Sequence, residues 1–209
     1  VLTLAKDVEI AQTNGLETVA AGKDRGIQLI DQLGHRVGRE RVADLLFHLG
    51  QIGMIAIDPR NTDIVFVAAE GSVWGPGGER GVYKTIDGGK TWENITPAGL
   101  PESLIQSIEV SPHEKGTAYV AATRYKFNEF SNMSFKTIDY GKTWTKIDAG
   151  VDKDDFIKVI REDRKMKGLL YGGAERGFYI SFNGGSNWQK LQLNLPVVPV
   201  TDIAFADND

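Results

Sequence analysis

Three related octapeptides place an acidic or amide side chain at the same position, where a carboxylate could do acid–base chemistry. They read TIDGGKTW at 85–92, TIDYGKTW at 137–144 and SFNGGSNW at 181–188. Asp87 and Asp139 have the chemistry of a nucleophile or a proton carrier, but Asn183 in the third copy does not. Asn keeps only the acceptor that a turn needs. The repetition and the Asn copy therefore favour an architectural role over a catalytic one.

The octapeptide also contains the residues that a tight turn between two strands requires. An Asp or Asn side chain accepts hydrogen bonds from backbone N–H groups just ahead of it. The glycine two positions later supplies a positive φ that other residues resist, and the final tryptophan can pack between adjacent sheets. We predict a structural role for nine residues: Asp87, Gly89, Trp92, Asp139, Gly141, Trp144, Asn183, Gly185 and Trp188.

Each octapeptide lies in a longer repeat of four short apolar runs, and the repeats recur at intervals of roughly 50 residues. The first runs are 52–59, 105–112 and 156–163, and the second runs are 63–70, 116–123 and 168–175. The third runs are 81–85, 133–137 and 177–181, and the fourth runs are 91–95, 143–147 and 187–191. Their alternation and their β-branched and aromatic residues predict strands. Repeated four-stranded units predict an all-β fold, a β-propeller of about four blades.

Composition agrees with an all-β chain and argues against several functional classes. The 209 residues include 24 Gly and 9% aromatic residues, and the net charge is −4 with both signs mixed. No basic stripe suggests nucleic acid, and no apolar run is long enough to insert in a membrane. The chain has no cysteine, and its three histidines are scattered, with His113 expected to be solvated in a turn. We therefore expect no cofactor and no metal site.

The N-terminal part of the chain, 1–50, is divergent, while 51–209 holds three predicted blades and a closing strand. Residues 15–34 can be aligned with the second and third strands of a blade, which the run at 200–207 would complete, closing the ring. The competing interpretation is helical, because 25–34 and 39–50 have apolar residues at helical spacing. The alternatives to closure within one chain are an excerpt of a larger propeller or self-association that completes the ring.

The pattern S/T-x-D-x-G-x-T-W resembles the Asp-box, or BNR repeat, of sialidases, xyloglucanase-like glycoside hydrolases and sortilin-type receptors. Residues 51–209 also look like large bacterial BNR or sortilin-like glycosyl hydrolases, which are usually much longer. The resemblance implies a β-propeller whose boxes lie far from the active site. It also implies a secreted or periplasmic protein whose partner is a polysaccharide or another protein.

The loops opposite the boxes are the place to look for a binding site, because they vary between the repeats. The loops 70–81 and 123–134 carry Trp74, Arg124, Tyr125 and Phe127, which suit a sugar by stacking and hydrogen bonding. We predict a ligand-binding role for these four residues. The alternative is that the loops cover the end of the core or an interface.

Glycoside hydrolysis needs two carboxylates across the scissile bond. Glu70 and Glu129 lie on the predicted loop face and are the catalytic candidates. The dipeptides 79–80 and 175–176 repeat an acid followed by Arg, which predicts ion pairs between blades instead. No arginine triad of a sialidase is recognisable. The sequence thus leaves two functions open: a carbohydrate-directed glycoside hydrolase, or a non-catalytic sortilin-like binding or assembly scaffold.

Overall fold

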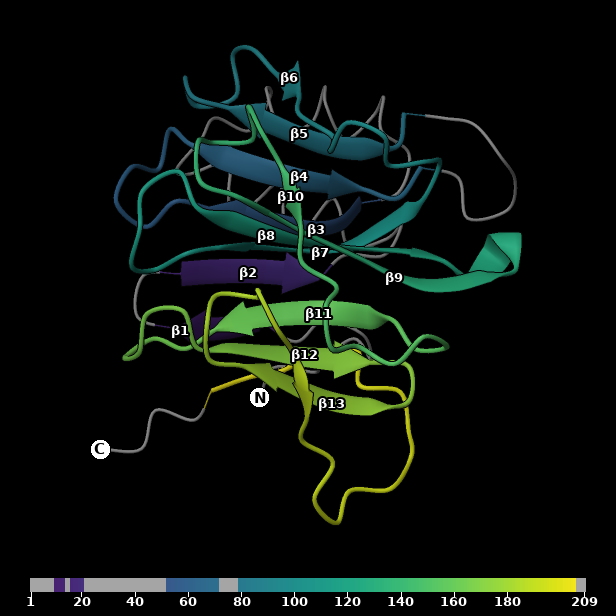
Figure 1. Ribbon diagram of the computed structural model, residues 1–209. Helices are drawn as coiled ribbons and strands as arrows, with labels where there is room; N and C mark the ends of the chain where they lie inside the picture. The colour runs from purple at the N-terminus through teal and green to yellow at the C-terminus, as the bar shows by residue number, and fades with distance from the viewer. Residues whose placement is uncertain (1–9, 14–15, 21–51, 72–78, 206–209) are drawn as a thin grey trace, which may run out of the picture.

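The computed structural model describes residues 10–13, 16–20, 52–71 and 79–205 (Figure 1). Within these residues the chain forms three antiparallel sheets and a single turn of 3-10 helix. The sheets succeed one another along the chain and lie side by side in space. The predicted all-β propeller architecture is confirmed, with three four-stranded blades in the described part of the chain.

The first sheet has the order β1-β2-β3-β4-β5-β6, so a hairpin extends its four-stranded blade. Its strands are β1 Ile10–Thr13, β2 Leu16–Ala20, β3 Ile52–Ile57, β4 Val65–Ala69, β5 Gly81–Thr85 and β6 Glu93–Asn94. Antiparallel pairing joins β2 to β3, the inner strand of the blade.

The second and third sheets each have four strands. The second holds β7 Leu104–Val110, β8 Ala118–Arg124, β9 Glu129–Thr137 and β10 Thr145–Lys146, with the 3-10 turn η2 Tyr125–Phe127 between β8 and β9. The third holds β11 Ile157–Glu162, β12 Leu170–Ala174, β13 Gly177–Ser181 and β14 Gln189–Lys190. These strands overlap all the runs predicted from the sequence in the three repeats.

The C-terminal run differs from its prediction, because residues 201–205 belong to no strand. A strand requires a ladder of backbone bonds, and only the Val200 amide donates to a neighbouring strand, at 2.9 Å from the Ala174 carbonyl. Residues 206–207, 21–34 and 39–50 lie outside the described part of the chain. The predicted closure of an N-terminal blade by the C-terminal run, and the helical alternative, therefore stay predictions.

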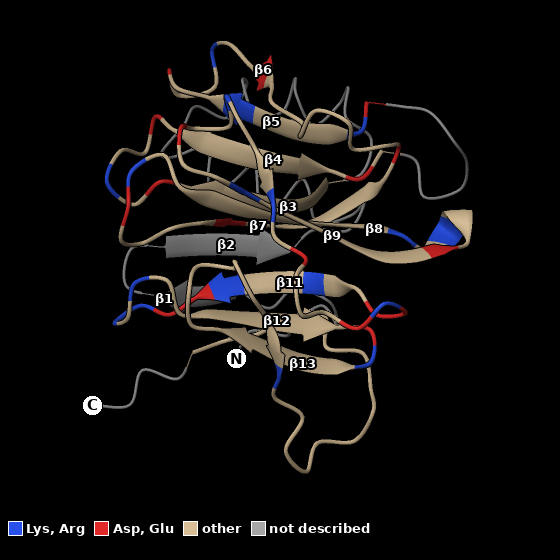
Figure 2. Ribbon diagram, in the orientation of Figure 1, with Lys and Arg blue, Asp and Glu red and all other residues tan. Residues whose placement is uncertain are grey.

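Each pair of neighbouring sheets encloses an apolar core. Phe66, Val82 and Ile108 belong to the cluster between the first and second sheets, and Tyr119 and Leu170 to the cluster between the second and third. The strands β3, β4 and β8 are buried along nearly their whole length, and Arg124 at the end of β8 is their single charged residue (Figure 2). A single blade cannot bury both of its faces, and this is why the repeats stack.

Every inner strand is irregular at the same place. The pairing register shifts between Ile52 and Met54 in β3, between Ile105 and Ser107 in β7, and between Ile157 and Val159 in β11. A β-bulge of this kind leaves one residue outside the ladder and bends the strand. In β3 that residue is Gly53, where an added Cβ would lie 2.6 Å from the Ile105 carbonyl oxygen.

The box turns and the turns between first and second strands lie on one face of the molecule. The amides of Gly88, Tyr140 and Gly184 each donate to the first turn of their own sheet, at 3.1, 2.9 and 2.8 Å from the carbonyls of Asp63, Gly116 and Gly168. The connections β4–β5, β8–β9 and β12–β13 therefore open on the opposite face. We call these two surfaces the box face and the loop face.

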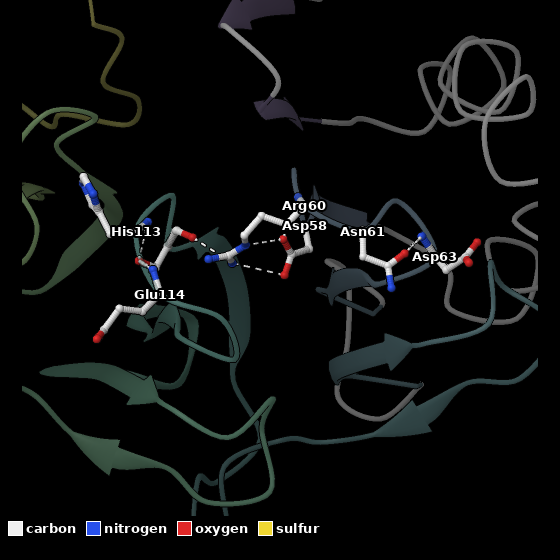
Figure 3. Close-up of polar contacts among 7 residues, drawn as sticks. Asp58, Arg60, Asn61, Asp63, His113 and Glu114 are labelled. Carbon is white, nitrogen blue, oxygen red and sulfur yellow. Dashed lines mark hydrogen bonds and ion pairs between the residues drawn. The ribbon is translucent and has the colours of Figure 1, made fainter.

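Polar contacts also link the box face from sheet to sheet. Arg60 is bound to Asp58 through two side-chain hydrogen bonds and donates to the Ser111 carbonyl at 3.1 Å (Figure 3). His113 in that same β7–β8 turn has its Nε2 2.7 Å from the Asp163 carbonyl. His113, expected from the sequence to be solvated, is half-buried, and the next sheet supplies its ring with a partner that lies 50 residues away in sequence.

Candidate functional site

The first box closes its turn with the Asp87 carboxylate. Oδ1 accepts hydrogen bonds from the amides of Lys90 and Thr91 at 2.9 and 3.0 Å, and Oδ2 accepts the Thr91 hydroxyl at 2.7 Å. The Thr85 hydroxyl donates to Asp87 Oδ1 and accepts the Gly89 amide at 2.9 Å. These bonds hold the pKa of Asp87 far below its usual value, the Thr91 hydroxyl having the largest effect.

The second and third boxes repeat this geometry with different side chains. Asp139 Oδ1 accepts the Thr143 amide at 2.9 Å, and Asn183 Oδ1 accepts the Asn187 amide at the same distance. The Thr143 hydroxyl bond is the main cause that lowers the pKa of Asp139 to about 2. An amide oxygen thus occupies the place of the carboxylate in the third sheet, and the three side chains are engaged in bonds to their own turns.

The box tryptophans join neighbouring sheets. The Trp144 indole Nε1 donates to the Ile95 carbonyl at 2.7 Å, and Trp188 Nε1 donates to the Ile147 carbonyl at 2.8 Å. In each case the acceptor follows the outer strand of the preceding sheet. Gly185 lies against the same residue, since an added Cβ would be 2.7 Å from Ile147 Cδ1.

Where the structure describes it, the loop face shows no such repetition, and it carries the predicted ligand-binding residues of the second sheet. Arg124 at the end of β8 forms an ion pair with Glu129 at 2.6 Å and donates to the Glu102 carbonyl. Its guanidinium carbon lies 4.7 Å from the centre of the Phe127 ring. The connection turns back through Asn128, which has a positive φ of 58°. The structure thus brings Arg124, Phe127 and Glu129 together.

An aromatic platform formed by Tyr125, Phe130 and Phe156 crosses from the second sheet to the third. The rings of Tyr125 and Phe156 are parallel within 2° with their centres 6.2 Å apart, and Phe130 lies 6.4 Å from Phe156. Phe156 is buried, whereas Tyr125 and Phe130 are 38% and 45% exposed. Two large rings are therefore held on a buried support and still face solvent.

Charged groups surround the platform. Lys158 of β11 lies 5.7 Å from the Phe156 ring centre and forms an ion pair with Glu175 at 2.5 Å. The pKa of Tyr125 is raised, first by burial and then by the negative charges of Glu70 and Glu175. Glu70 follows β4 in the first sheet, Tyr125 belongs to the second sheet, and Glu175 follows β12 in the third. Three blades thus contribute to one region of the loop face.

The two catalytic candidates have opposite electrostatic environments. Burial raises the pKa of Glu70, and the positive charges of Lys126 and Arg80 only partly oppose this. Hydrogen bonds from Arg124 and Ser131 lower the pKa of Glu129.

Sequence reasoning found only part of this region. Arg124, Tyr125 and Phe127 were predicted and lie close together, while Trp74 lies outside the described residues. Phe156 and Lys158 were missed, because they sit at the start of a strand in the next blade and only the stacking of sheets brings them to the platform.

The predicted ion pairs of the two acid–Arg dipeptides take different forms. Arg80 pairs with Glu102 at 2.9 Å, across the link to the second sheet. Glu175 pairs within its own sheet, with Lys158 of β11, so the prediction of a pair between blades is wrong for this dipeptide. In the residues that the structure describes, no group of three or more His, Asp or Glu side chains could hold a metal ion. No helix there is long and apolar enough to cross a membrane.

Comparison with known proteins identifies the family. A family model described as Sortilin-Vps10 (sortilin, neurotensin receptor 3) matches residues 51–206. The chain belongs to the Sortilin-Vps10 family. Its membership rests on the three boxed sheets, because the match begins next to β3 and ends just beyond the described residues.

Two relatives of this Sortilin-Vps10 chain represent different kinds of protein. A probable oligoxyloglucan-reducing end-specific xyloglucanase of Neosartorya fischeri is 27% identical over 112 residues, which make up 53% of this chain and 14% of that protein. A vacuolar protein sorting/targeting protein 10 of Fusarium vanettenii is 33% identical over 72 residues, which make up 34% of this chain and 4% of that protein. The chain thus matches a small part of the length of each relative.

A solved structure supports the fold. The GH74 xyloglucanase from Xanthomonas campestris superposes with a TM-score of 0.56 at 17% identity, covering 88% of this chain and 29% of that chain. At this identity the similarity identifies the β-propeller architecture.

Proposed function

We propose that this protein binds an extracellular polysaccharide on its loop face, with the aromatic platform as the main contact. The observation that carries the proposal is the exposed pair Tyr125 and Phe130 on buried Phe156, with carboxylates of the first and third sheets beside Tyr125. In this proposal the nine box residues support the blades and do not touch the ligand. A polysaccharide outside the cell requires a secreted or periplasmic protein.

The chemistry of the platform fits a sugar chain. The apolar face of a pyranose ring can pack on an aromatic ring, while its hydroxyl groups require hydrogen-bond partners nearby. Glu70, Glu175 and Lys158 supply such partners around Tyr125. Arg124 and Phe127 stack on each other at the rim, where Arg124 can add further donors. Trp74, on the neighbouring loop by sequence, remains a proposed contact.

A second candidate function is hydrolysis of the bound glycan. The observation that favours it is the opposite shift of the two carboxyl pKa values, raised at Glu70 and lowered at Glu129. A raised pKa suits a general acid, and an ionised carboxylate suits a base or a nucleophile. The similarity to a xyloglucanase points to β-glucan chains as the first substrates to test.

The test combines a glycan array with a hydrolysis screen on the same polysaccharides. Tyr125→Ala should weaken binding about tenfold or more, because it removes one stacking surface. Phe182→Ala is the matched control, since Phe182 is 63% exposed but lies in a box turn. Equal binding by the wild type and Tyr125→Ala, or no glycan binding at all, would contradict the proposal.

Turnover separates the two candidate functions. Loss of hydrolysis in Glu70→Gln with binding retained supports the hydrolase. Binding of glycan without turnover supports the non-catalytic module, and Glu70→Gln should then leave affinity within about threefold of the wild type, a change of less than 1 kcal/mol.

A further inference from the structure

The turns of the box face expose apolar side chains at one repeated position. Ile86, Ile138 and Phe182 follow the first residue of the three boxes and are 63%, 67% and 63% exposed. Met166, in the turn between β11 and β12, is 57% exposed. An apolar side chain that stays in water adds little to the stability of the fold. A single exposed residue of this kind is ordinary, but here the same exposed position holds an apolar side chain in all three sheets.

These side chains are exposed whether or not another sheet follows. Ile86 and Ile138 belong to sheets that have a following sheet packed against them, and they are as exposed as Phe182 of the third sheet. Asn61 is the first-sheet equivalent of Met166, because the carbonyl of each accepts the amide three residues later, at 3.0 and 3.2 Å. Asn61 is exposed too. The exposure is therefore a property of the box face and does not result from the position of the third sheet.

The exposed charged side chains of the same turns are mainly cationic. The six described turns of the box face are 58–64, 86–91, 111–117, 138–143, 163–169 and 182–187. Their one exposed anion is Asp63. Their exposed cations are Arg60, Lys90, Lys115, Lys142, Lys165 and Lys167. A protein with a net charge of −4 thus presents mainly cations at the outer surface of these turns.

The other acidic residues of these turns are buried or half-buried, and most of them are engaged within the protein. The carboxylates of Asp87 and Asp139 accept hydrogen bonds from their own boxes. Asp58 pairs with Arg60, and Glu114 pairs with Lys167 at 2.5 Å. The box turns therefore direct their acids inward and their lysines outward.

The repeat sets the apolar side chains of the boxes at one level. The blades of a propeller are related by rotation about a common axis, so equivalent residues lie at the same height along it. The amides of Gly88, Tyr140 and Gly184 donate to the same turn of their own sheets, which fixes each box at that height. Packed sheets lie about 10 Å apart, so three boxes extend over about 20 Å or more. A partner that contacts all three boxes at once is therefore broad and flat.

We propose that the box face docks on the surface of a lipid bilayer that contains anionic lipids. Such a surface is broad and flat, and it carries negatively charged headgroups above an apolar layer. Ile86, Ile138 and Phe182 enter the headgroup layer, and the surrounding lysines contact the lipid phosphates. Apolar side chains next to Lys and Arg are typical of protein surfaces that lie at a membrane interface.

The contact is peripheral, because side chains of turns make it. It leaves the loop face, on the opposite side of the molecule, open to solvent, so a protein docked in this way can still bind a glycan. The proposal does not rest on the glycan site.

The test is co-sedimentation of the 209-residue chain with vesicles of phosphatidylcholine, with and without phosphatidylserine. We expect binding to the vesicles that contain phosphatidylserine, and weaker binding at high salt, because salt screens the attraction between lysines and lipid. The triple variant Ile86→Ser, Ile138→Ser, Phe182→Ser should weaken binding about tenfold or more, since its side chains no longer gain from leaving water.

The matched control for the apolar side chains is the double variant Leu193→Ser, Val197→Ser, which should bind as the wild type does. These two residues are 82% and 73% exposed. They follow β14 at its loop-face end, where Gln192 lies against Gly177.

A pair of charge reversals tests the lysines. Lys142→Glu and Lys153→Glu change the net charge equally, and both residues are exposed. Lys142 lies in a box, whereas Lys153 lies in the link before Phe156, on the side of the loop face. Lys142→Glu should weaken binding to the anionic vesicles about fivefold or more, and Lys153→Glu less than about twofold, because the attraction fades beyond about 10 Å from the lipid.

Heparin, a soluble polyanion without an apolar layer, separates the two sources of negative charge, and far-UV circular dichroism checks that each variant is folded. The proposal would be overturned by no vesicle binding, by equal binding to neutral and anionic vesicles, by a triple variant that binds as the wild type does, or by equal effects of the two charge reversals. Retention on heparin together with any of these results would identify a soluble polyanion as the partner instead.

Discussion

The two faces of the propeller differ in how closely they repeat. On the box face, Asp87, Asp139 and Asn183 each accept the backbone amide four residues further along the chain, although Asn183 has no charge. On the loop face the three connections differ in length, and the exposed rings of Tyr125 and Phe130, among the residues that the structure describes, both belong to the second sheet. The side chains that support the fold are thus repeated from sheet to sheet, whereas the exposed side chains that could contact a ligand differ between the sheets.

The largest expected effect is the loss of a box tryptophan. Trp188→Ala should lower the free energy of unfolding by about 3–5 kcal/mol, because it empties a fully buried site and leaves the Ile147 carbonyl without its donor. Urea unfolding followed by circular dichroism measures this. Phe182→Ala in the same box should change stability by less than about 0.5 kcal/mol. Equal losses in the two variants would mean that the box does not support the blades through its tryptophan.

Gly185→Ala should cost about 2–4 kcal/mol, since the residue has a positive φ of 89° and its new Cβ would meet Ile147. Gly99→Ala is the matched control. Gly99 has a φ of 80° but open space around it, so only the backbone term of about 1 kcal/mol should remain. The difference between the urea midpoints of the two variants measures the contact of residue 185 with Ile147. Equal midpoints would mean that this contact between sheets does not contribute to stability.

On the loop face, the two glutamate substitutions should have opposite effects, and removal of the Glu70 charge should stabilise the fold. Burial raises the folded-state pKa of Glu70, so the folded protein favours the protonated form of this side chain. The stabilisation from protonated Glu70 is complete below the unfolded-state pKa, and it is lost as pH rises through the folded-state pKa. Glu70→Gln should therefore raise the melting temperature at pH 7 and leave it unchanged near pH 4. Glu129→Gln should do the opposite at pH 7, because its folded-state pKa is lowered. A lower melting temperature of Glu70→Gln at pH 7 would mean that ionised Glu70 stabilises the fold, as the box residues do.

The smallest effect is expected when the Asp of one box is replaced by the Asn that the third box carries. Asp139→Asn keeps one oxygen acceptor, as Asn183 does, but it loses the Oδ2 that accepts the Thr143 hydroxyl, so stability at pH 7 should fall slightly. The lowered folded-state pKa of Asp139, about 2, gives the wild type a contribution that is present above the unfolded-state pKa and lost as pH falls toward 2. Melting curves from pH 6 to 2 should therefore fall less steeply for Asp139→Asn. Identical acid profiles would mean that the carboxylate charge adds nothing.

The sequence predicted what is local and repeated. The boxes, the strand runs and the loop residues Arg124, Tyr125 and Phe127 could be found because each depends on its own neighbours in the chain. The contacts between blades could not. Phe156 under Tyr125, His113 on the Asp163 carbonyl and Trp144 on the Ile95 carbonyl join residues that are far apart in sequence. Only the stacking of the sheets decides which of these pairs meet.

The bulge that recurs in the inner strands has a practical consequence for altering the protein. It frees Gly53, Gln106 and Lys158 from the strand ladders at the end next to the loop face. Gly53 is fixed by the Ile105 carbonyl, but the side chains of Gln106 and Lys158 can be exchanged without breaking a ladder bond or emptying a core. The fold therefore contains adjustable positions, at least one of them beside the aromatic platform, at which side chains can be exchanged independently of the scaffold.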